Sequence, residues 1–479
     1  MITISLKTDS DIPMYIQIYE YIKKEILAGR LSAPEKLPSA RSLAAHLQVS
    51  RSTVDTAYEQ LVAEGYVDAR EKRGYFVNSI THMTGFTDSV VPDFSTESHI
   101  PSAPEFFEFN PDAIDTTHFP YTVWKSIGKN QLDNPRNFTA GDNLGEPSLR
   151  HAVATYLHGS RGVSCEPDQV VVGAGLAHLL QMLSILFDRK PTVAFEKPGY
   201  QNARRVLLHN GCSIVDIPLK NSVMDVEALA DSSASLCYVT PSHQFPMGSV
   251  MPASTRDQLL KWASEKEGRY ILEDDHDSEF RYTGRPIPAL QSFYKQDTVI
   301  YIGTFSKAIS PALRVGYMIL PKALMKQYKK ICGTFPCPVS KTTQAILADF
   351  IHKGYFEKHL NRMRKIYKGK HDFLLTQIQK YLPAPLFSVS GDNAGLYVLL
   401  HYRGSRSDDE ILENAQKNNI RLCSLNDYYP DPDVVSSHTY LIGFADLSPE
   451  EITKGILLLA EKVFLSPGSY PGSLRCSSQ

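Results

Sequence analysis

Apolar side chains recur at helical spacing in the first part of the chain. Within residues 12–29 they stand three or four positions apart, at Ile12, Tyr15, Ile16, Tyr19, Ile22 and Ile26. This spacing is typical of a helix with one buried face, and Gly29 is suited to end that helix. Two further helices are expected directly after Ser39 and Ser50, because serine is a favoured N-cap and apolar residues follow each at helical spacing.

Residues 66–77 (YVDAREKRGYFV) alternate apolar and polar side chains about a charged turn, which predicts a short β-hairpin. A helix, a helix–turn–helix and a hairpin together predict a winged helix over residues 1–78. Residues 79–108 then lose periodicity and are rich in Ser, Thr and Pro, so they are expected to form a semi-extended linker. Residues 468–479 are expected to be a disordered tail.

From residue 109 onward, short strands rich in Val and Ile alternate with helical stretches. The strand candidates are QVVVGAG, PTVAFEK, CSIVDIP, SLCYVT, RYILEDD and TVIYIGTFSK. This alternation predicts βαβ units and a mostly parallel sheet. After about residue 345, a helix-rich stretch precedes AGLYVLLHY and TYLIGFAD, which favours a smaller α+β subdomain. The sequence therefore predicts a multidomain α/β protein whose second domain spans residues 109–467.

Composition limits the range of functions. A chain of 479 residues is too long for one core, and it has no run of 18 apolar residues that would cross a membrane. The N-terminus lacks the apolar stretch of a signal peptide, and the seven cysteines show no common zinc spacing. We therefore expect a cytoplasmic protein with reduced thiols, no metal site and no membrane partner.

The helix–turn–helix carries side chains suited to DNA. The second helix of such a motif enters the major groove with its N-terminal residues, which here are Ser50, Arg51, Ser52 and Thr53. Arg41 on the preceding helix and Arg73 and Gly74 at the hairpin tip complete the candidate set. Bulk charge does not support DNA binding, because residues 1–77 contain ten Lys or Arg and ten Asp or Glu. Any one of these arginines alone is more simply a solvated surface residue, so the argument depends on the joint pattern.

A second constellation lies in the α/β domain. Lys307 follows a predicted strand with Thr304 and Ser306 beside it, and Arg314 can pair a phosphate in bidentate fashion. Asp274 ends another strand, and Tyr200 offers a flat ring. A strand also ends at the start of a helix, where free N–H groups favour phosphate; its last residues are Gly173, Ala174 and Gly175.

These groups match the requirements of pyridoxal 5′-phosphate (PLP). The cofactor needs an amine for a Schiff base, an anion site, a carboxylate on its pyridine nitrogen and a partner for its ring. A lone lysine after a strand is usually a surface residue, and a GAG turn is usually only a turn. All four features occur, in an order along the chain that a PLP site can use, so a chance combination is improbable.

The segment LPSARSLAAHLQVSRSTVDTAYEQLVAEGYV resembles the helix–turn–helix signature of the GntR family of bacterial regulators. The resemblance covers residues 12–77. It implies that Arg41, Arg51, Thr53 and the pair Arg73–Gly74 contact promoter DNA. Asp55 stands where many members carry arginine, which is expected to alter the preferred sequence.

Residues 109–465 resemble the fold-type I aminotransferases, and the motifs TPSHQFPMG, YILEDDHDSEF and YIGTFSKAISPALRVGYMILP resemble the MocR/GabR subfamily of GntR regulators. The resemblance implies a PLP aldimine on Lys307, Asp274 on the pyridine nitrogen, Tyr200 stacked on the ring, and Arg314 with Ser306 on the phosphate. It also implies a head-to-tail homodimer in which each DNA-binding head lies over the partner's large domain.

Four positions depart from that subfamily. His276 replaces a tyrosine that touches the cofactor's phenolic oxygen, and Phe245 replaces an asparagine of the enzymes. In the GABA-responsive relatives two arginines hold the effector carboxylate, and a hand alignment places Asn202 and Asp427 there. A carboxylate-bearing effector is therefore less expected. The signal is either PLP itself, as in PdxR-like regulators of vitamin B6 synthesis, or an amine whose cationic end meets Asp427.

We favour PLP as the signal because it needs no second ligand site. A PLP-dependent transcriptional regulator is preferred over an aminotransferase with an appended N-terminal domain, because obvious arginines for a substrate carboxylate are missing. A residual half-reaction of transamination remains compatible with the sequence.

Overall fold

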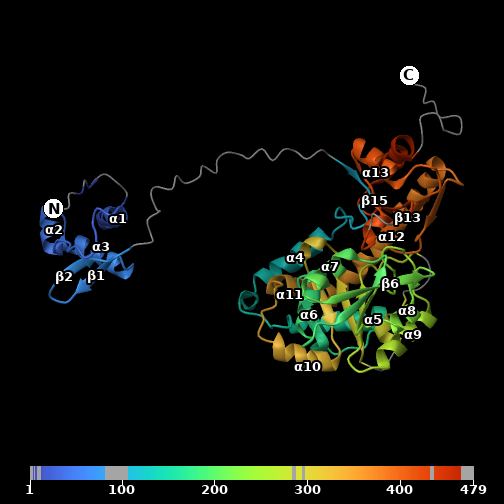
Figure 1. The fold of residues 1–479 in the computed structure, drawn as a ribbon, viewed down its shortest axis with the longest axis horizontal. Helices are drawn as coiled ribbons and strands as arrows, with labels where there is room; N and C mark the ends of the chain where they lie inside the picture. The colour runs from blue at the N-terminus through green and yellow to red at the C-terminus, as the bar shows by residue number, and fades with distance from the viewer. Residues whose placement is uncertain are drawn as a thin grey trace, which may run out of the picture. The chain divides into compact units, whose positions relative to one another are not determined.

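The computed structural model describes residues 4, 6–7, 12–80, 106–282, 287–293, 297–431 and 436–464. The chain divides into two compact units, Met1–Ala103 and Pro104–Gln479, and each is described by itself (Figure 1). The expected tail at residues 468–479 and most of the expected linker at residues 79–108 lie outside the described residues.

The N-terminal unit is a winged helix, as the pattern of apolar residues predicts. Its elements are α1 (Met14–Leu27), α2 (Ala40–Leu47), α3 (Arg51–Ala63), β1 (Val67–Arg70) and β2 (Gly74–Val77). The Ser39 hydroxyl accepts a hydrogen bond from the backbone N–H of Ser42 at 3.1 Å, and Ser50 caps α3 in the same way. The two strands pair in antiparallel register, and the core is formed by Ile18, Ile22, Val54, Tyr58 and Leu61 among others.

The C-terminal end of the expected linker is part of the second unit. Residues Phe107–Glu108 form β3, which pairs in parallel with β14 (Ile420–Arg421). Phe109, directly after β3, is fully buried. Burial of these aromatic side chains fixes the segment, so the linker prediction was wrong for residues 107 and 108.

An eight-stranded sheet forms the centre of the second unit. Its order is β4-β11-β10-β9-β8-β5-β6-β7, and five neighbouring strands from β10 to β6 run parallel. Strand β11 runs antiparallel to both of its neighbours, and β7 pairs antiparallel with β6. The prediction of a mostly parallel sheet is confirmed. The bounds are β4 (Val170–Gly173), β5 (Thr192–Lys197), β6 (Ser213–Lys220), β7 (Val223–Met224), β8 (Leu236–Val239), β9 (Tyr270–Asp275), β10 (Val299–Thr304) and β11 (Gly316–Ile319).

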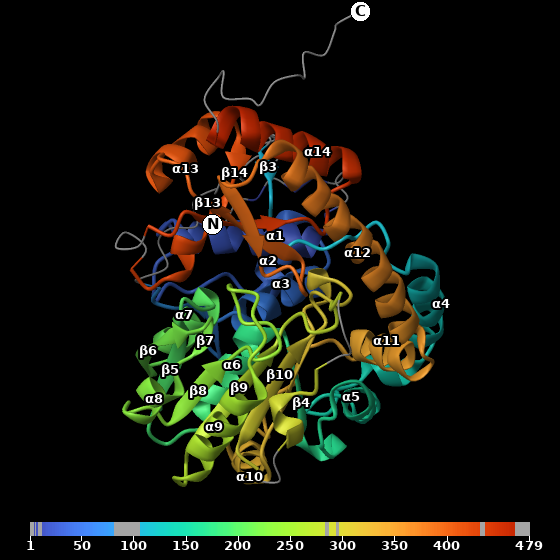
Figure 2. The same cartoon turned by 90° about the vertical axis from the view of Figure 1, so that its right-hand side faces the viewer.

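Helices cover both faces of this sheet (Figure 2). In β9, Ile271 packs in the cluster that contains the buried side of α9, whereas Leu272 packs in the cluster that contains α6. This alternation follows from the two-residue period of a strand. The helices of this region are α4 (Tyr121–Leu132), α5 (Pro147–Arg161), α6 (Leu176–Ile185), α7 (Gln201–His209), α8 (Val226–Ala230), α9 (Ala253–Ser264), α10 (Lys322–Ile331) and α11 (Lys341–His352).

A smaller α+β subdomain follows the long helix α12 (Tyr355–Tyr381), as the sequence predicts. Its antiparallel sheet has the order β12-β13-β16-β15. Its remaining elements are β12 (Phe387–Ser390), β13 (Tyr397–Tyr402), α13 (Asp408–Lys417), β15 (Cys423–Ser424), the 3₁₀ turn η5 (Leu425–Tyr428), β16 (Thr439–Gly443) and α14 (Pro449–Leu458). Among the described residues, no helix combines the length and apolarity that a membrane crossing requires.

Candidate cofactor site and nucleic-acid interface

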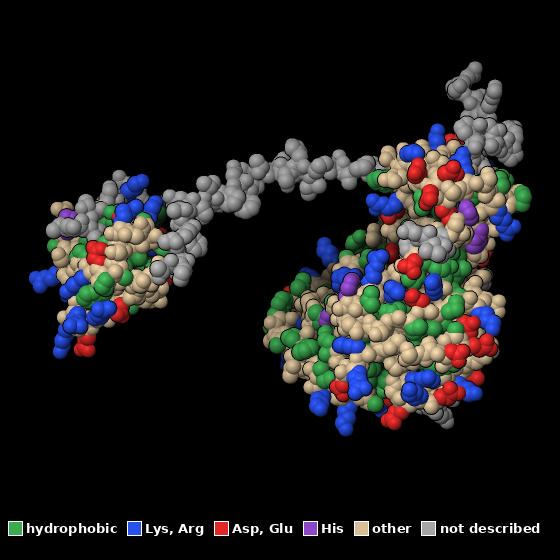
Figure 3. All heavy atoms as spheres, viewed as in Figure 1, with side chains coloured by type: hydrophobic (Ala, Val, Ile, Leu, Met, Phe, Trp, Pro, Cys, Tyr) green, Lys and Arg blue, Asp and Glu red, His purple; other side chains and the backbone are tan. Residues whose placement is uncertain are grey.

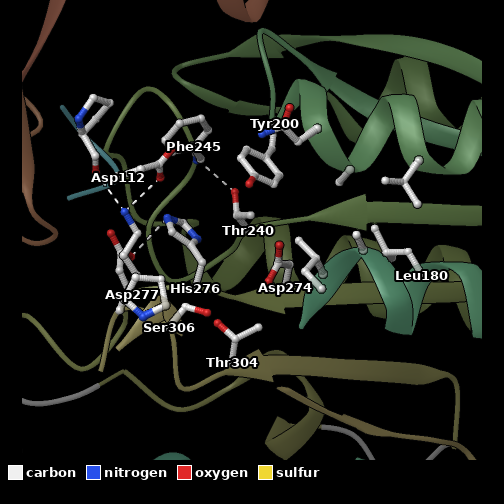
Figure 4. Close-up of a pocket in the computed structure, with 18 of the residues that line it drawn as sticks. Asp112, Leu180, Tyr200, Thr240, Phe245, Asp274, His276, Asp277, Thr304 and Ser306 are labelled. Carbon is white, nitrogen blue, oxygen red and sulfur yellow. Dashed lines mark hydrogen bonds and ion pairs between the residues drawn. The ribbon is translucent and has the colours of Figure 1, made fainter. Parts of the chain in front are cut away.

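A cavity of about 660 Å³ lies at the carboxyl ends of the parallel strands. Open α/β sheets bind ligands at this edge, and Figure 4 shows Asp274 and Thr304 at strand ends with Tyr200 and Phe245 across the cavity from them. Most of the residues that the sequence predicts to contact the cofactor or effector line this cavity. They are Tyr200, Asn202, Asp274, His276, Thr304, Ser306, Lys307 and Arg314.

Lys307 lies three residues beyond the end of β10, and its side chain is 15% exposed. Its amine donates one hydrogen bond to the backbone oxygen of Pro111 at 2.9 Å and another to Oδ1 of Asp112 at 2.9 Å. Both partners come from the segment after β3, and both line the cavity. Sequence reasoning missed them because nothing local links residues 111–112 to a lysine almost two hundred positions away.

Asp274, in β9, is buried in the floor of the cavity. The hydroxyl of Tyr238 donates a hydrogen bond to its Oδ2. Burial raises the pKa of Asp274 to about 6, although the nearby His276 and the bond from Tyr238 act in the opposite direction. A buried carboxylate that lines a cavity can accept a hydrogen bond from a protonated ring nitrogen.

His276 belongs to a buried group with His243 and Asp277. His243 Nδ1 lies 2.8 Å from Oδ2 of Asp277, and His276 Nε2 lies 3.3 Å from Oδ1 of Asp277. Burial opposes the charged imidazole, but the negative charges of Asp277 and Asp274 raise the pKa of His276 to about 9. The same two imidazoles hold the pKa of Asp277 well below its ordinary value despite burial. These donor types also suit a transition metal, but the ion pairs already account for the Asp277 carboxylate, so we assign no metal role.

The predicted anion site is built around Arg314 and the start of α6. The Arg314 guanidinium donates to the backbone oxygen of Ala174 at 3.4 Å. Gly175 has φ +82, and a Cβ there would lie 2.9 Å from Arg314 Nη2, so glycine makes room for the guanidinium. Gly173, Ala174 and Gly175 do not line the cavity themselves but end β4 beside it, where the first N–H groups of α6 are free for an anion.

Aromatic side chains form one wall of the cavity. The Tyr200 ring meets Phe245 edge-on, with ring centroids 5.4 Å apart, and Phe245 meets Tyr397 at 5.7 Å. The hydroxyl of Thr240 accepts a hydrogen bond from the Phe245 backbone at 2.9 Å. This wall leaves Tyr200 beside the space between Lys307 and Asp274, where it can cover a planar ring.

Asp427 does not belong to the cavity lining. Its Oδ2 accepts a hydrogen bond from the Ser424 backbone N–H at 3.1 Å, within a capping box at the start of η5. The Asp427 carboxylate thus bonds to the local backbone, and its contact with an effector stays a prediction. Asn202, the other nominated effector residue, does line the cavity.

The side chains present fit PLP. An amine, a buried carboxylate, an arginine at a helix start and an aromatic ring face one cavity, and a side chain at Gly175 would displace the arginine. PLP would be held by Lys307 through its aldehyde, by Asp274 through its ring nitrogen, and by Arg314 with Ser306 through its phosphate.

The candidate DNA-binding residues gather at the start of α3 and on the hairpin of the N-terminal unit. Arg41, Arg51 and Ser52 are exposed. Arg51 forms an ion pair with Asp55 at 3.3 Å. Ser50 differs from the others, because its hydroxyl accepts from the Thr53 backbone at 3.1 Å and lies 2.8 Å from the Ser52 hydroxyl, so its evident role is to cap the helix.

The tip of the hairpin is exposed and charged. Glu71, Lys72 and Arg73 are all exposed, and Figure 3 shows blue and red side chains at this end of the unit. Gly74 has φ +102, a conformation that L side chains rarely adopt, and a Cβ there would lie 3.0 Å from Lys36 Cε. Gly74 therefore shapes the turn that presents Arg73.

Comparisons with known proteins agree with this division. Residues 14–77 match the model of bacterial regulatory proteins of the gntR family, and residues 111–478 match that of class I and II aminotransferases. The chain is 38% identical to the HTH-type transcriptional regulator YdeL of Bacillus subtilis, over 95% of this chain and 98% of YdeL. It is 33% identical to the probable rhizopine catabolism regulatory protein MocR of Rhizobium meliloti, over 94% of each chain.

A third relative is the HTH-type pyridoxine biosynthesis transcriptional regulator PdxR of Corynebacterium glutamicum, with 30% identity over 86% of this chain and 88% of PdxR. Among solved structures, the multiple substrate aminotransferase from Thermococcus profundus aligns with a TM-score of 0.68 and 22% identity, over 76% of this chain and 92% of the enzyme. That likeness shows the aminotransferase fold of the second unit. The chain therefore belongs to the MocR subfamily of GntR-type transcriptional regulators, which join a winged helix to an aminotransferase-like domain.

Proposed function

We propose that this regulator binds PLP covalently through Lys307 and that occupancy of this site by PLP is the signal that changes its binding to promoter DNA. The observation that carries the proposal is the position of the Lys307 amine, in one cavity with Asp274, Arg314 and Tyr200. When bound, PLP supplies an aldehyde that condenses with an amine. Regulation then requires that PLP favour one arrangement of the protein over another.

Each side chain has a separate task in this proposal. Lys307 would provide the amine, Asp274 would hold the proton of the pyridine nitrogen, and His276 would serve as a charged donor to the phenolic oxygen. Tyr200 excludes water from one face of the ring, and Arg314 neutralises the phosphate. The pKa of His276, about 9, keeps the imidazole protonated at neutral pH, so it can donate where a tyrosine hydroxyl serves in relatives.

Two observations support sensing over turnover. The relatives YdeL, MocR and PdxR are described as regulators, and PdxR as a regulator of pyridoxine biosynthesis. In the cavity, the Asp112 carboxylate contacts the Lys307 amine and disfavours a substrate carboxylate beside it. The winged helix would bind promoter DNA as part of a homodimer, with Arg41, Arg51, Thr53 and Arg73 at the duplex.

Titration of PLP into the apo protein tests the proposal. Binding should produce a near-visible absorption band, and the affinity for promoter DNA should change over the same range of PLP concentration. Lys307→Ala should abolish both the band and the change in DNA affinity. A band without any change in DNA affinity would reject PLP as the signal, and a Lys307→Ala protein that keeps the band would reject the lysine assignment.

A second candidate signal is a small amine that reacts with bound PLP. The position of Asp112 favours it, because a carboxylate near Lys307 could hold a second cationic group of the ligand. An amine effector would change the DNA affinity of the PLP-loaded protein, whereas PLP alone would not. Steady turnover of an amino donor with a keto acid would instead indicate an aminotransferase.

A further inference from the structure

The contact between Lys307 and residues 111–112 joins two parts of the second unit. Lys307 follows a strand of the large sheet, whereas the segment before Asp112 is bound to the small subdomain. Strand β3 pairs with β14, and the Phe109 backbone oxygen accepts from the N–H of Gly443, in β16, at 3.3 Å. The lysine amine is therefore hydrogen-bonded to a segment that belongs to the small subdomain.

The same segment is where the chain enters the second unit. Residue 106 follows, along the sequence, the stretch that connects to the winged helix. Asp112 lies only four residues beyond Glu108, the end of β3. A change at Asp112 therefore acts on the first described residues of this unit, and the chain before them leads to the DNA-binding unit.

We propose that Asp112 is the positioning residue that reports the state of Lys307: it pairs with the free ammonium, and covalent attachment of PLP to Lys307 releases it. This inference rests on the proposed function, because it requires PLP to react with Lys307. The released segment then alters how the small subdomain, through β3 and β14, is held against the large sheet.

The chemistry of the condensation requires that the lysine nitrogen lose at least one of its two hydrogen bonds to residues 111–112. In the condensation, the lysine nitrogen forms a double bond to the aldehyde carbon, and the aldehyde oxygen leaves as water with two of the three ammonium protons. The nitrogen keeps at most one N–H, whereas the two hydrogen bonds to Pro111 and Asp112 need two donors. At least one of these bonds is therefore lost when PLP is attached.

Other contacts of the segment are not touched by the reaction, so the lost contact falls first on residues 110–112, directly after β3 and Phe109. Phe109 is fully buried, and Asp115 is held by Lys370 at 2.8 Å and by the Thr117 hydroxyl. Between Phe109 and Asp115, the Asp112 side chain bonds to Lys307. The Asp112 backbone N–H donates to Asn110 Oδ1 at 2.8 Å. Asp112 is more than half exposed, so the energy of the pair is modest, and the predicted effect is a change in population rather than unfolding.

The test compares Asp112→Asn with Glu108→Gln in the full chain. Both variants remove one negative charge from the same segment, but Glu108 contacts Arg421 at 3.7 Å and not Lys307. Hydrogen exchange of a peptide covering residues 106–112 is measured with and without PLP, alongside the near-visible absorption of bound PLP and the affinity for promoter DNA.

In the wild type and in Glu108→Gln, PLP should speed exchange in this peptide. Asp112→Asn should exchange quickly without PLP, and the effect of PLP on its DNA affinity should shrink by about two- to fivefold, the range expected for a partly exposed ion pair. Comparing hydrogen exchange of the wild-type peptide with and without PLP needs no variant, so it tests the role of Asp112 even if Asp112→Asn folds poorly.

Unchanged exchange of the wild-type peptide when PLP absorption shows full occupancy would overturn the role of Asp112 and leave the proposed function standing. The role of Asp112 would also be overturned if PLP changed hydrogen exchange and DNA affinity as much in Asp112→Asn as in the wild type. Failure of every protein to acquire the absorption band would instead overturn the proposed function, and the inference with it.

Discussion

The imidazole of His276 is the side chain through which pH acts on this site. Its pKa is raised to about 9 against burial, chiefly by Asp277, and its side chain is 22% exposed. A histidine whose pKa is higher in the folded state stabilises the fold fully below its unfolded pKa, and loses that contribution as pH rises through the folded value. Stability from this pair should therefore fall between about pH 6.5 and pH 9.

We predict that the free energy of unfolding of the wild type falls relative to that of His276→Gln across this range, by at most roughly 3 kcal/mol. Urea denaturation of both apo proteins at several pH values measures it. The difference between them isolates His276, because the other ionisable groups of the site are present in both. Parallel curves for the two proteins would show that His276 is not held charged by Asp277.

Two acidic residues, Asp427 and Asp112, show which contacts can be predicted from sequence at this scale. Asp427 was nominated by alignment with an effector arginine, but it lies in a Ser-x-x-Asp stretch and caps its own 3₁₀ turn, a role that local sequence could have revealed. Asp112 was not nominated, because its contact with Lys307 arises only when distant segments fold together. Residues that a motif names were found more reliably than residues that only the fold brings close.

Among the elements, α3 combines a serine that caps it with an arginine that we propose to contact DNA. Ser50 caps the helix through the Thr53 backbone N–H, so Ser50→Ala should lower the stability of the winged helix by about 1 kcal/mol. Thermal or urea denaturation measures the loss. Ser52→Ala is the matched control, because Ser52 is exposed and does not cap the helix, and it should cost much less. Equal losses in the two variants would contradict the capping role.

The pair of Arg51 and Asp55 sets the charge at the start of the same helix. Asp55 lies one turn beyond Arg51 and neutralises part of its charge at 3.3 Å. Asp55→Asn should therefore tighten binding to DNA of any sequence by about two- to fivefold, with a steeper dependence on salt. Arg51→Ala should weaken specific binding by about 1–3 kcal/mol.

Fluorescence anisotropy with labelled duplexes at several salt concentrations measures both variants. Glu59→Gln serves as the control for Asp55→Asn, because Glu59 is an exposed acid on the same helix, two turns from Arg51. If Asp55→Asn binds no tighter than Glu59→Gln, the ion pair does not restrain Arg51.

Periodicity predicted most elements, and the reasons are visible in the core. Of the apolar residues whose spacing predicts α1, Tyr19, Ile22 and Ile26 are buried. Ile12 and Tyr15, predicted on the same face, are exposed, and Ile18 is buried instead. The order of strands in the large sheet could not be predicted in this way. Strand β11 inserts antiparallel between β4 and β10, and this pairing depends on long-range contacts rather than on any local pattern. The same holds for β3, whose two residues carry too little pattern to signal a strand.

At the scale of the whole molecule, two units that match different protein families share one chain. The winged helix matches a regulator family, and the second unit matches an enzyme family. Neither unit alone explains why the cavity retains a lysine, a buried carboxylate and an arginine. If PLP at Lys307 changes DNA binding, the two sites are linked, and linkage of equilibrium binding is reciprocal.

Reciprocity gives a quantitative prediction for the intact protein. If saturating PLP changes the affinity for promoter DNA by a given factor, saturating promoter DNA must change the affinity for PLP by the same factor. The first factor comes from anisotropy and the second from titration of the near-visible band, both at one salt concentration. Arg51→Ala is the control, since DNA that it binds weakly should leave its PLP affinity unchanged at the same DNA concentration. A factor of one in both titrations would mean that PLP and promoter DNA do not act on a shared equilibrium, whereas unequal factors would show that one of the titrations had not reached equilibrium, because reciprocity holds for any pair of equilibrium binding sites.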